Sequence, residues 1–343
     1  MHGRPFLASV TRLSELNSEG LPFQEFPREQ WANADLVVGE VLSEPGALSK
    51  VELSTGRLID LMRGDRIVGA LGRRAATLEC VGDFESIGDD LQMDLMTPGG
   101  LLGKITSQSS FLGPLPRLRY LGHATVQGGK VSLANYVGRL PVHSLKIPVV
   151  LIVGTSMSAG KTATARLLIR LLKQSGWKVA AAKLTGAARY RDILSMHDAG
   201  ADHIMDFVDV GLPSSICSEA EYTQALQQMV ARLGTLNVDV LVAEAGASPL
   251  EPYNGATAIG LLADQIRFTA LAASDPYAVV GVMKAFAMSP DLVTGVATNT
   301  SAGISLIEKM SGALALNILD ESSWTRVNQL LLSRLSGIEG AGG

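Results

Sequence analysis

"VVLIVGTSMSAGKTATARLL", residues 149–168, is the most informative stretch for the fold of the second half of this chain. The apolar run 149–153 predicts a buried strand that ends at Gly154, and apolar residues at helical spacing follow Gly160, Lys161 and Thr162. A strand, a glycine-rich loop, Gly-Lys-Thr and a helix, in that order, form the context of a phosphate-binding loop. This context favours nucleotide binding over an ordinary strand-to-helix turn that happens to contain Gly-Lys-Thr.

The residue types of the loop suit a nucleotide and its metal ion. Glycines let backbone N–H groups approach phosphates, and the start of the following helix adds its positive end. We expect Lys161 to reach the β- and γ-phosphate oxygens and the Thr162 hydroxyl to bind Mg²⁺. The residues expected to contact the nucleotide here are Gly154, Thr155, Ser158, Ala159, Gly160, Lys161 and Thr162.

The chain has two halves of different texture, and its 343 residues suffice for two domains. From residue 35 to about 138, short strand-like pieces follow each other closely, with turns such as "STGR" and "RGDR". This predicts a small all-β, barrel-like domain at 35–138, after an N-terminal extension at 1–34. Scaffolding, partner contact and a substrate platform all remain open as roles for it.

A linker, "RLPVHSLKIP" at 139–148, precedes the second half. From 149 to 343 apolar strands with little alternation alternate with helical patterns, which predicts strands buried on both faces. We therefore predict an α/β domain with a doubly wound, mostly parallel sheet and a phosphate-binding loop. Ligands of such sheets bind at the carboxyl ends of the strands.

Composition excludes several classes of protein. A net charge of −4 gives no electrostatic reason to expect nucleic acid or an anionic membrane surface as a partner. No stretch has the roughly 18 uncharged apolar residues that a membrane span needs. Two distant cysteines form no disulfide framework, which favours a reducing compartment. We expect a cytoplasmic protein.

The loop "GTSMSAGKT" departs from the usual motif, because five residues separate Gly154 from Gly160. It resembles the "GTDTGVGKT" loop of dethiobiotin synthetase and its ATPase relatives, and Thr155 stands where some of those relatives have a further lysine. "AKLTG" (182–186), "VAEAGAS" (242–248) and "GVATN" (295–299) resemble three other segments of that enzyme. These matches span roughly residues 148 to 320.

"AEAGASPLEPY", residues 243–253, is more similar to the "VEGQGSLxHPxY" segment of a P-loop family that includes D-glutamate N-acetyltransferases. Two differences separate the segments. This chain has one extra residue between Ser248 and Leu250, and Glu251 replaces the histidine before the proline. The resemblance is confined to the second domain.

Acidic residues near the expected strand ends are candidates for metal binding. Glu244 follows an apolar strand, where a carboxylate is a natural Mg²⁺ ligand or, alternatively, a helix cap. Five aspartates lie between 192 and 209, and phosphoryl transfer needs negative charge around Mg²⁺. Asp192 is ranked first because it is nearest the strand end after Lys183. His197 and His203 lack the i,i+4 spacing of metal ligands on a helix and are expected to be structural.

Lys183 ends an apolar strand, which favours a role against a phosphate or a substrate carboxylate over that of an exposed lysine. With Lys161 it completes the catalytic residues that we expect. The favoured function is that of an ATP- and Mg²⁺-dependent enzyme, a ligase or transferase. It would activate a small carboxylate or carbamate by phosphoryl transfer, in the manner of dethiobiotin synthetase.

Two alternatives remain open. The second resemblance implies a CoA-dependent N-acyltransferase acting on an amino acid. Other relatives of the ATPase group imply a nucleotide-dependent switch that docks a partner protein and forms a homodimer.

Asn299 is the candidate that distinguishes ATP from GTP. Its amide offers a donor and an acceptor that suit the N6 and N7 edge of adenine. No acid follows at the spacing of the Asn-Lys-x-Asp element that reads guanine. The alternative is that Asn299 caps the helix that begins near Gly303.

Overall fold

The computed structural model describes residues 4–142, 144–246 and 248–336, and the chain forms two compact units. One unit comprises Met1–Leu140, Gly186–Asp192 and Phe207–Leu226, and the other comprises Pro141–Thr185, Ile193–Asp206 and Gln227–Gly343. The predicted domains and motifs include residues 1–3, 143, 247 and 337–343, which lie outside the residues that the structure describes. Two segments that the sequence places in the second domain therefore belong to the first unit.

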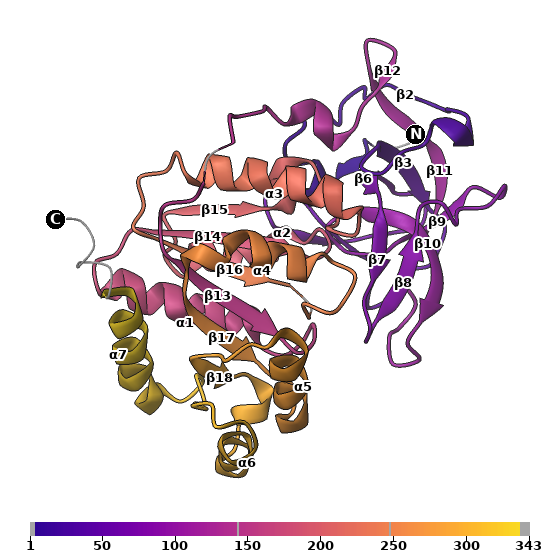
Figure 1. Ribbon diagram of the computed structural model, residues 1–343. Helices are drawn as coiled ribbons and strands as arrows, with labels where there is room; N and C mark the ends of the chain where they lie inside the picture. The colour runs from indigo at the N-terminus through magenta and orange to yellow at the C-terminus, as the bar shows by residue number, and fades with distance from the viewer. Residues whose placement is uncertain (1–3, 143, 247, 337–343) are drawn as a thin grey trace. The chain divides into compact units, whose positions relative to one another are not determined.

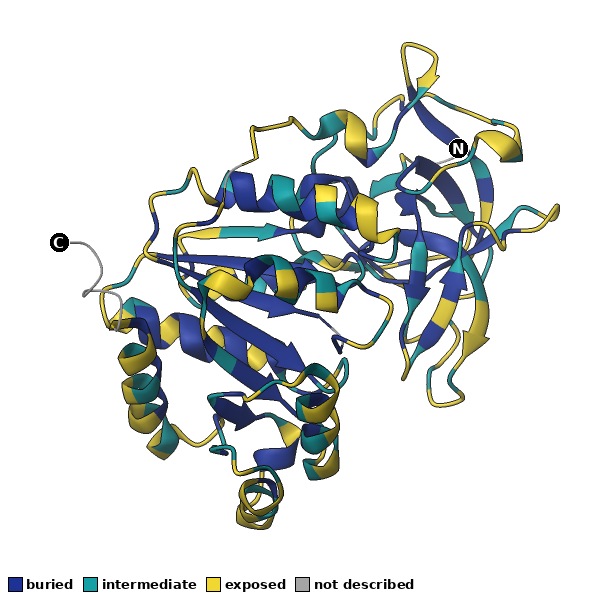
Figure 2. Ribbon diagram, in the orientation of Figure 1, coloured by how far each residue is buried: buried dark blue, intermediate teal, exposed yellow. Residues whose placement is uncertain are grey.

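The second unit is built on a six-stranded sheet (Figure 1). All its pairings are parallel, and the strand order is β15-β14-β16-β13-β17-β18. The strands are β13 (Val149–Gly154), β14 (Val179–Thr185), β15 (His203–Asp206), β16 (Val240–Ala245), β17 (Ile266–Ala272) and β18 (Leu292–Thr294). Every residue of β13, β14 and β16 is buried, as Figure 2 shows in dark blue. Their continuous apolar sequences reflect this burial on both faces.

Helices connect these strands and cover both faces of the sheet. They are α1 (Lys161–Gln174), α2 (Tyr190–Asp198), α3 (Glu219–Leu233), α4 (Gly255–Leu262), α5 (Pro276–Phe286), α6 (Ser301–Ser311) and α7 (Trp324–Leu335). The chain passes from β13 toward one edge of the sheet and later from β16 toward the other. Right-handed crossovers then place α1 and α4 on opposite faces. The predicted doubly wound fold is confirmed.

The first unit is a β-rich domain, as predicted. Its strands are β1 (Phe6–Leu7), β2 (Phe23–Gln24), β3 (Leu36–Val41), β4 (Lys50–Glu52), β5 (Leu58–Asp60), β6 (Arg66–Leu71), β7 (Arg73–Ala75), β8 (Cys80–Asp83), β9 (Gln92–Leu95), β10 (Leu101–Gln108), β11 (Arg117–Val126) and β12 (Gly129–Lys130). Five strands pair in a closed ring, β6-β3-β11-β9-β10, in which only β10 and β6 are parallel. The region 1–34, expected to be an extension, supplies β1 and β2 to this sheet.

Seven 3₁₀ helices complete the secondary structure of the described residues. They are η1 (Ser9–Thr11), η2 (Arg28–Gln30), η3 (Leu133–Tyr136), η4 (Phe207–Val210), η5 (Ala263–Gln265), η6 (Val296–Thr298) and η7 (Glu321–Ser323).

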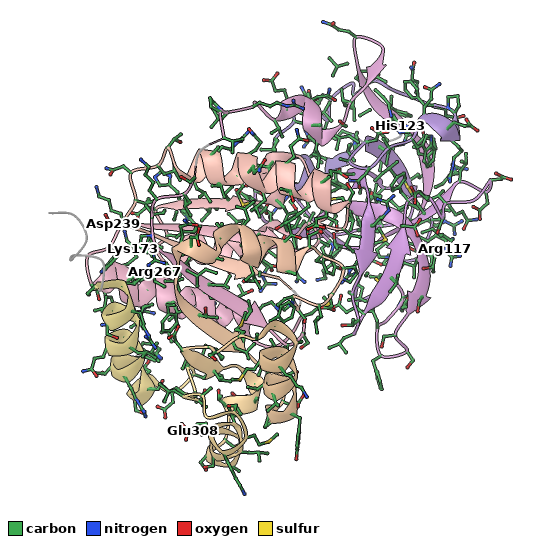
Figure 3. All side chains as sticks on the ribbon, in the orientation of Figure 1. Arg117, His123, Lys173, Asp239, Arg267 and Glu308 are labelled. Carbon is green, nitrogen blue, oxygen red and sulfur yellow. The ribbon has the colours of Figure 1, made fainter. Side chains whose placement is uncertain are left out.

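A polar network surrounds His123 in the first unit; this side chain is fully buried, and Figure 3 labels it. The Tyr120 hydroxyl lies 2.6 Å from His123 Nδ1, and Asp35 Oδ2 lies 3.2 Å from His123 Nε2. Lys130 Nζ lies 2.6 Å from the same carboxylate oxygen. Burial raises the pKa of Asp35, but hydrogen bonds from His123 and Lys130 lower it by more. The net result is a pKa below the ordinary value of an aspartate. The network therefore holds a charged carboxylate inside the domain.

Glu52 of β4 explains how residues 186–192 join the first unit. Its fully buried carboxylate accepts hydrogen bonds from the Tyr190 and Arg191 backbone N–H groups at 2.6 and 3.0 Å. These are the first N–H groups of α2, which have no partner within the helix. The guanidinium of Arg12 stacks on the Tyr190 ring and pairs with Asp209 at 2.8 Å. A carboxylate at the helix N-terminus is also favoured by the helix dipole.

Candidate functional site

The predicted loop connects β13 to α1 at the carboxyl edge of the parallel sheet, as a phosphate-binding loop does. Gly160 adopts the left-handed conformation directly before α1. The Thr155 N–H donates to the Ala272 carbonyl at 3.0 Å, and the Thr155 and Ser274 hydroxyls lie 3.0 Å apart. Neighbouring β17 therefore anchors the first residue of the loop. Ser158 is exposed, whereas Ala159 is buried.

Lys161 folds back over the loop instead of extending into solvent. Its side chain is almost completely buried, and Nζ donates to the Ser156 carbonyl at 2.6 Å. A Cβ on Gly154 would lie within 2.9 Å of Lys161 Cγ and Nζ, so only glycine leaves room for this path. The ammonium is thus held at the loop, where phosphate oxygens could replace the carbonyl as its acceptor.

Thr162 and Glu244 bring a hydroxyl and a carboxylate together beside the loop. Thr162 Oγ1 donates to Glu244 Oε2 at 3.1 Å, although the residues are 82 positions apart. Oxygen ligands of this kind suit Mg²⁺, which usually takes one or two protein ligands together with phosphates and water. The pair fits the expected metal. No group of three or more His, Cys, Asp or Glu side chains suited to a metal is found in the part of the chain that the structure describes.

Three charged residues lie in one row across the sheet, at its carboxyl edge. Lys183 of β14 is the register partner of Glu244 in β16 on one side and of Asp206 in β15 on the other. Their exposed fractions are 7%, 2% and 1%. A Cβ on Gly246 would lie 3.6 Å from Lys183 Cε, which places this side chain beside the loop that follows β16. The structure thus brings together Lys183 and Glu244, two residues that the sequence singled out separately.

The segment after β18 packs on the phosphate-binding loop. The Val296 N–H donates to the Ala159 carbonyl at 3.3 Å, and an ideal Cβ on Gly160 would lie 3.2 Å from Gly295 Cα. Asn299 is exposed at the end of η6. The cap of α6 is Thr300, whose hydroxyl accepts from the Gly303 N–H at 3.2 Å. The alternative that Asn299 caps this helix is therefore wrong.

The five acids between 192 and 209 are placed very differently. Asp192 lies in the first turn of α2, 3.8 Å from Arg189, within the segment assigned to the first unit. Asp198 ends α2, and Asp209 pairs with Arg12. The Asp202 carboxylate accepts hydrogen bonds from Lys173 Nζ and from the Val179 N–H at the amino edge of the sheet. Lys173 is labelled in Figure 3. A metal-binding role for Asp192 stays a prediction.

Two residues of this site, Asp206 and Gly295, were not singled out from the sequence. Asp206 is the acid of the five that the register places beside Lys183. Its signal was available, because it follows the short apolar-rich run "HIM" at a strand end. Gly295 has φ of 96°, and an ideal Cβ there would lie 2.1 Å from the Ala159 carbonyl oxygen. The local sequence around Gly295 does not predict its contact with Ala159.

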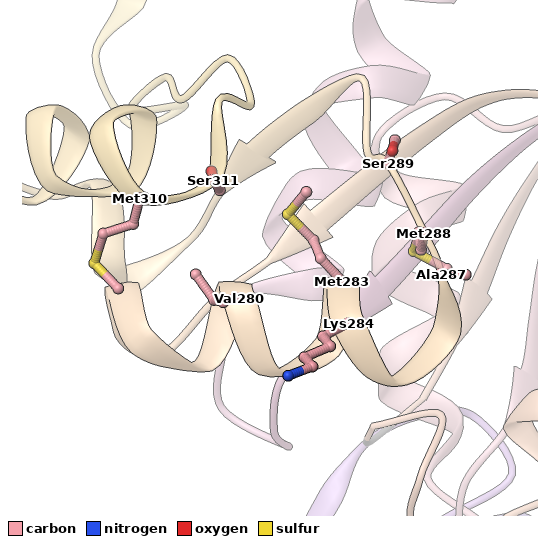
Figure 4. A pocket seen from close by; sticks show the side chains of 8 residues that line it. All are labelled: Val280, Met283, Lys284, Ala287, Met288, Ser289, Met310 and Ser311. Atoms are coloured by element: carbon pink, nitrogen blue, oxygen red, sulfur yellow. The ribbon is translucent and has the colours of Figure 1, made fainter.

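A groove that no residue of the phosphate-binding loop lines is shown in Figure 4. It has a volume of about 400 Å³ and lies between the last turns of α5 and α6. Methionines 283, 288 and 310 are among its lining residues, together with Lys284. Both helices begin at the carboxyl edge, so their last turns lie far from the site.

Comparison with known proteins supports the assignment of the loop. A sequence profile of a domain of unknown function, the DUF1611 P-loop domain, matches residues 136–190, which is less than half of the chain. No curated protein matches the sequence. The second unit therefore contains a P-loop domain, the type that binds nucleotide phosphates.

Solved structures show only a distant likeness. FtsY from the chloroplast of Physcomitrella patens is 16% identical, with 58% of this chain and 70% of that chain covered and a TM-score of 0.39. A DUF1611 family protein from Anabaena variabilis is 19% identical, with coverages of 57% and 62% and a TM-score of 0.39. A nucleotide-binding protein in complex with ADP from Archaeoglobus fulgidus is 9% identical, with coverages of 56% and 88% and a TM-score of 0.36.

None of the helices within the described ranges has the length and apolarity needed to cross a membrane.

Proposed function

We propose that this protein is an ATP- and Mg²⁺-dependent enzyme that activates a small carboxylate or carbamate by phosphoryl transfer. The observation that carries the proposal is a second buried lysine at the carboxyl edge of the sheet. Lys183 lies in the register row of Glu244, and the Glu244 carboxylate accepts a hydrogen bond from Thr162 of the P-loop. A nucleotide switch needs Lys161 and Thr162, whereas a buried second cation suits an anionic substrate or a transferred phosphoryl group.

The expected chemistry assigns a separate task to each side chain. An oxygen of the substrate attacks the γ-phosphorus, the bond to the β,γ-bridging oxygen breaks, and ADP leaves. The product is a mixed anhydride that an amine can capture. Lys161 and Lys183 stabilise the charge on the phosphoryl oxygens. Thr162 and Glu244 would hold Mg²⁺, which would supply further positive charge against the phosphates.

Calorimetry with Mg–ATP tests the nucleotide site directly. Lys161→Ala removes a charge-assisted contact to phosphate, which costs about 1.5–3 kcal/mol, or roughly 10- to 150-fold in affinity. Lys173→Ala is the matched control, because Lys173 pairs with Asp202 at the other edge of the sheet. Wild-type binding no tighter than that of Lys161→Ala would refute the nucleotide site.

A comparison of ligands tests the reaction class. We expect ATP to raise the melting temperature more than GTP or acetyl-CoA, and small carboxylates in a metabolite pool to stimulate ADP release. Stabilisation by acetyl-CoA alone would refute phosphoryl transfer and favour a CoA-dependent acyltransferase instead. A shift to a dimer on ATP addition in light scattering, without any metabolite-stimulated ADP release, would replace it by a switch.

A further inference from the structure

The row across β15, β14 and β16 contains one ammonium between two carboxylates. Register partners in neighbouring parallel strands point to the same face of the sheet, and the strands lie about 4.8 Å apart. Asp206 and Glu244 therefore flank Lys183 on one face. All three side chains are more than nine-tenths buried, and buried charges require partners.

The two carboxylates have different surroundings. Glu244 accepts a hydrogen bond from Thr162 of the P-loop, so it belongs to the proposed Mg²⁺ site. Asp206 lies on the opposite side of Lys183, on the outermost strand of the sheet. When Glu244 serves the metal, Asp206 is the carboxylate of the row that remains for the lysine.

We propose that Asp206 is a positioning residue for Lys183, which directs the ammonium toward the transferred phosphoryl group. The Cε atom of Lys183 already lies beside Gly246, at the start of the loop that follows β16. An ion pair with its register partner Asp206 would keep the side chain at this edge, in one orientation, while the nucleotide and metal occupy the other side. The inference rests on the proposed phosphoryl transfer, because Lys183 needs a fixed position only if it acts on a developing charge.

Through Lys183, Asp206 is expected to strengthen binding of the transferred phosphoryl group and to leave binding of the nucleotide itself unchanged. Calorimetry should compare Mg–ADP with Mg–ADP–aluminium fluoride, which mimics the phosphoryl group in transfer. The wild type is expected to bind the mimic more tightly than Mg–ADP. Asp206→Asn should reduce that advantage about tenfold and leave the affinity for Mg–ADP within about twofold, because misplacing one charged donor weakens only the contact that it makes.

Two controls separate positioning from a structural role. Asp202→Asn changes an aspartate of the same segment that holds Lys173 at the amino edge, so it should leave the advantage of the mimic unchanged. Asp206→Glu keeps the charge and should restore most of the advantage. In a Lys183→Met background, Asp206→Asn should cause no further loss, since coupled residues are non-additive.

The outcomes distinguish this inference from the proposed function. If the wild type binds the mimic no more tightly than Mg–ADP, phosphoryl transfer itself is refuted. If the wild type shows the advantage and Asp206→Asn retains it, or if the losses from Asp206→Asn and Lys183→Met simply add, the positioning role is overturned. Equal losses for Mg–ADP and the mimic, with a lowered melting temperature, would also overturn it and make Asp206 a structural residue.

Discussion

Substitution of Gly295 by alanine should damage the P-loop at Ala159, 136 residues earlier in the chain. Gly295 has φ of 96° and ψ of −160°, a region that only glycine adopts readily and that costs other residues about 1–3 kcal/mol. The new Cβ would also lie 2.1 Å from the Ala159 carbonyl oxygen. A normal C···O contact is about 3.3 Å, so the two backbones must separate by roughly 1 Å.

That separation displaces the residue before Gly160, where phosphates are expected to bind. A misplacement of about 1 Å in a binding site can cost on the order of 100-fold, so we expect Mg–ATP affinity to fall by roughly 10- to 100-fold. Isothermal calorimetry measures this loss. Differential scanning fluorimetry of the free protein measures the stability change, expected to be about 2–4 °C for each kcal/mol.

Gly312→Ala is the matched control for Gly295→Ala. Gly312 has φ of 69° and no atom within 4 Å of its ideal Cβ, so this variant carries backbone strain without the clash. We expect a loss of about 1–2 kcal/mol in stability and unchanged Mg–ATP affinity. Wild-type affinity in Gly295→Ala, or an equal loss of affinity in Gly312→Ala, would refute the reasoning.

Three further predictions concern other parts of the chain. Because the pKa of Asp35 is lowered in the fold, its ionised form stabilises the protein above about pH 4. Asp35→Asn should therefore lower the melting temperature at neutral pH, and the difference from the wild type should shrink as pH falls; a pH-independent difference would contradict this. Burial raises the pKa of Cys217 to about 12, so iodoacetamide at pH 8 should leave it unmodified in the native state, as mass spectrometry can show. Asn299→Ala should weaken ATP binding by about 1–3 kcal/mol with little change in melting temperature, whereas equal wild-type affinity for ATP and GTP would exclude adenine reading.

The sequence alone determined the features that depend on short-range pattern. The P-loop was predicted from the run 149–153, the loop to Gly160 and the helical spacing after Lys161. This was possible because strand burial and helix amphipathicity depend on the pattern of residues that are close in sequence. The β-rich character of the first half followed from closely spaced strands and turns. Glu244 was singled out as a candidate for the same reason, because it stands near the end of an obvious strand.

Which distant residues meet follows from the three-dimensional packing. Register between β14 and β15 places Asp206, one of five acids in its segment, beside Lys183, and the segment after β18 packs against the P-loop at Gly295. The burial of Glu52 against the first N–H groups of α2 assigns residues 186–192 to the barrel unit. Such contacts depend on strand order and three-dimensional packing, which join residues that have no relation along the chain.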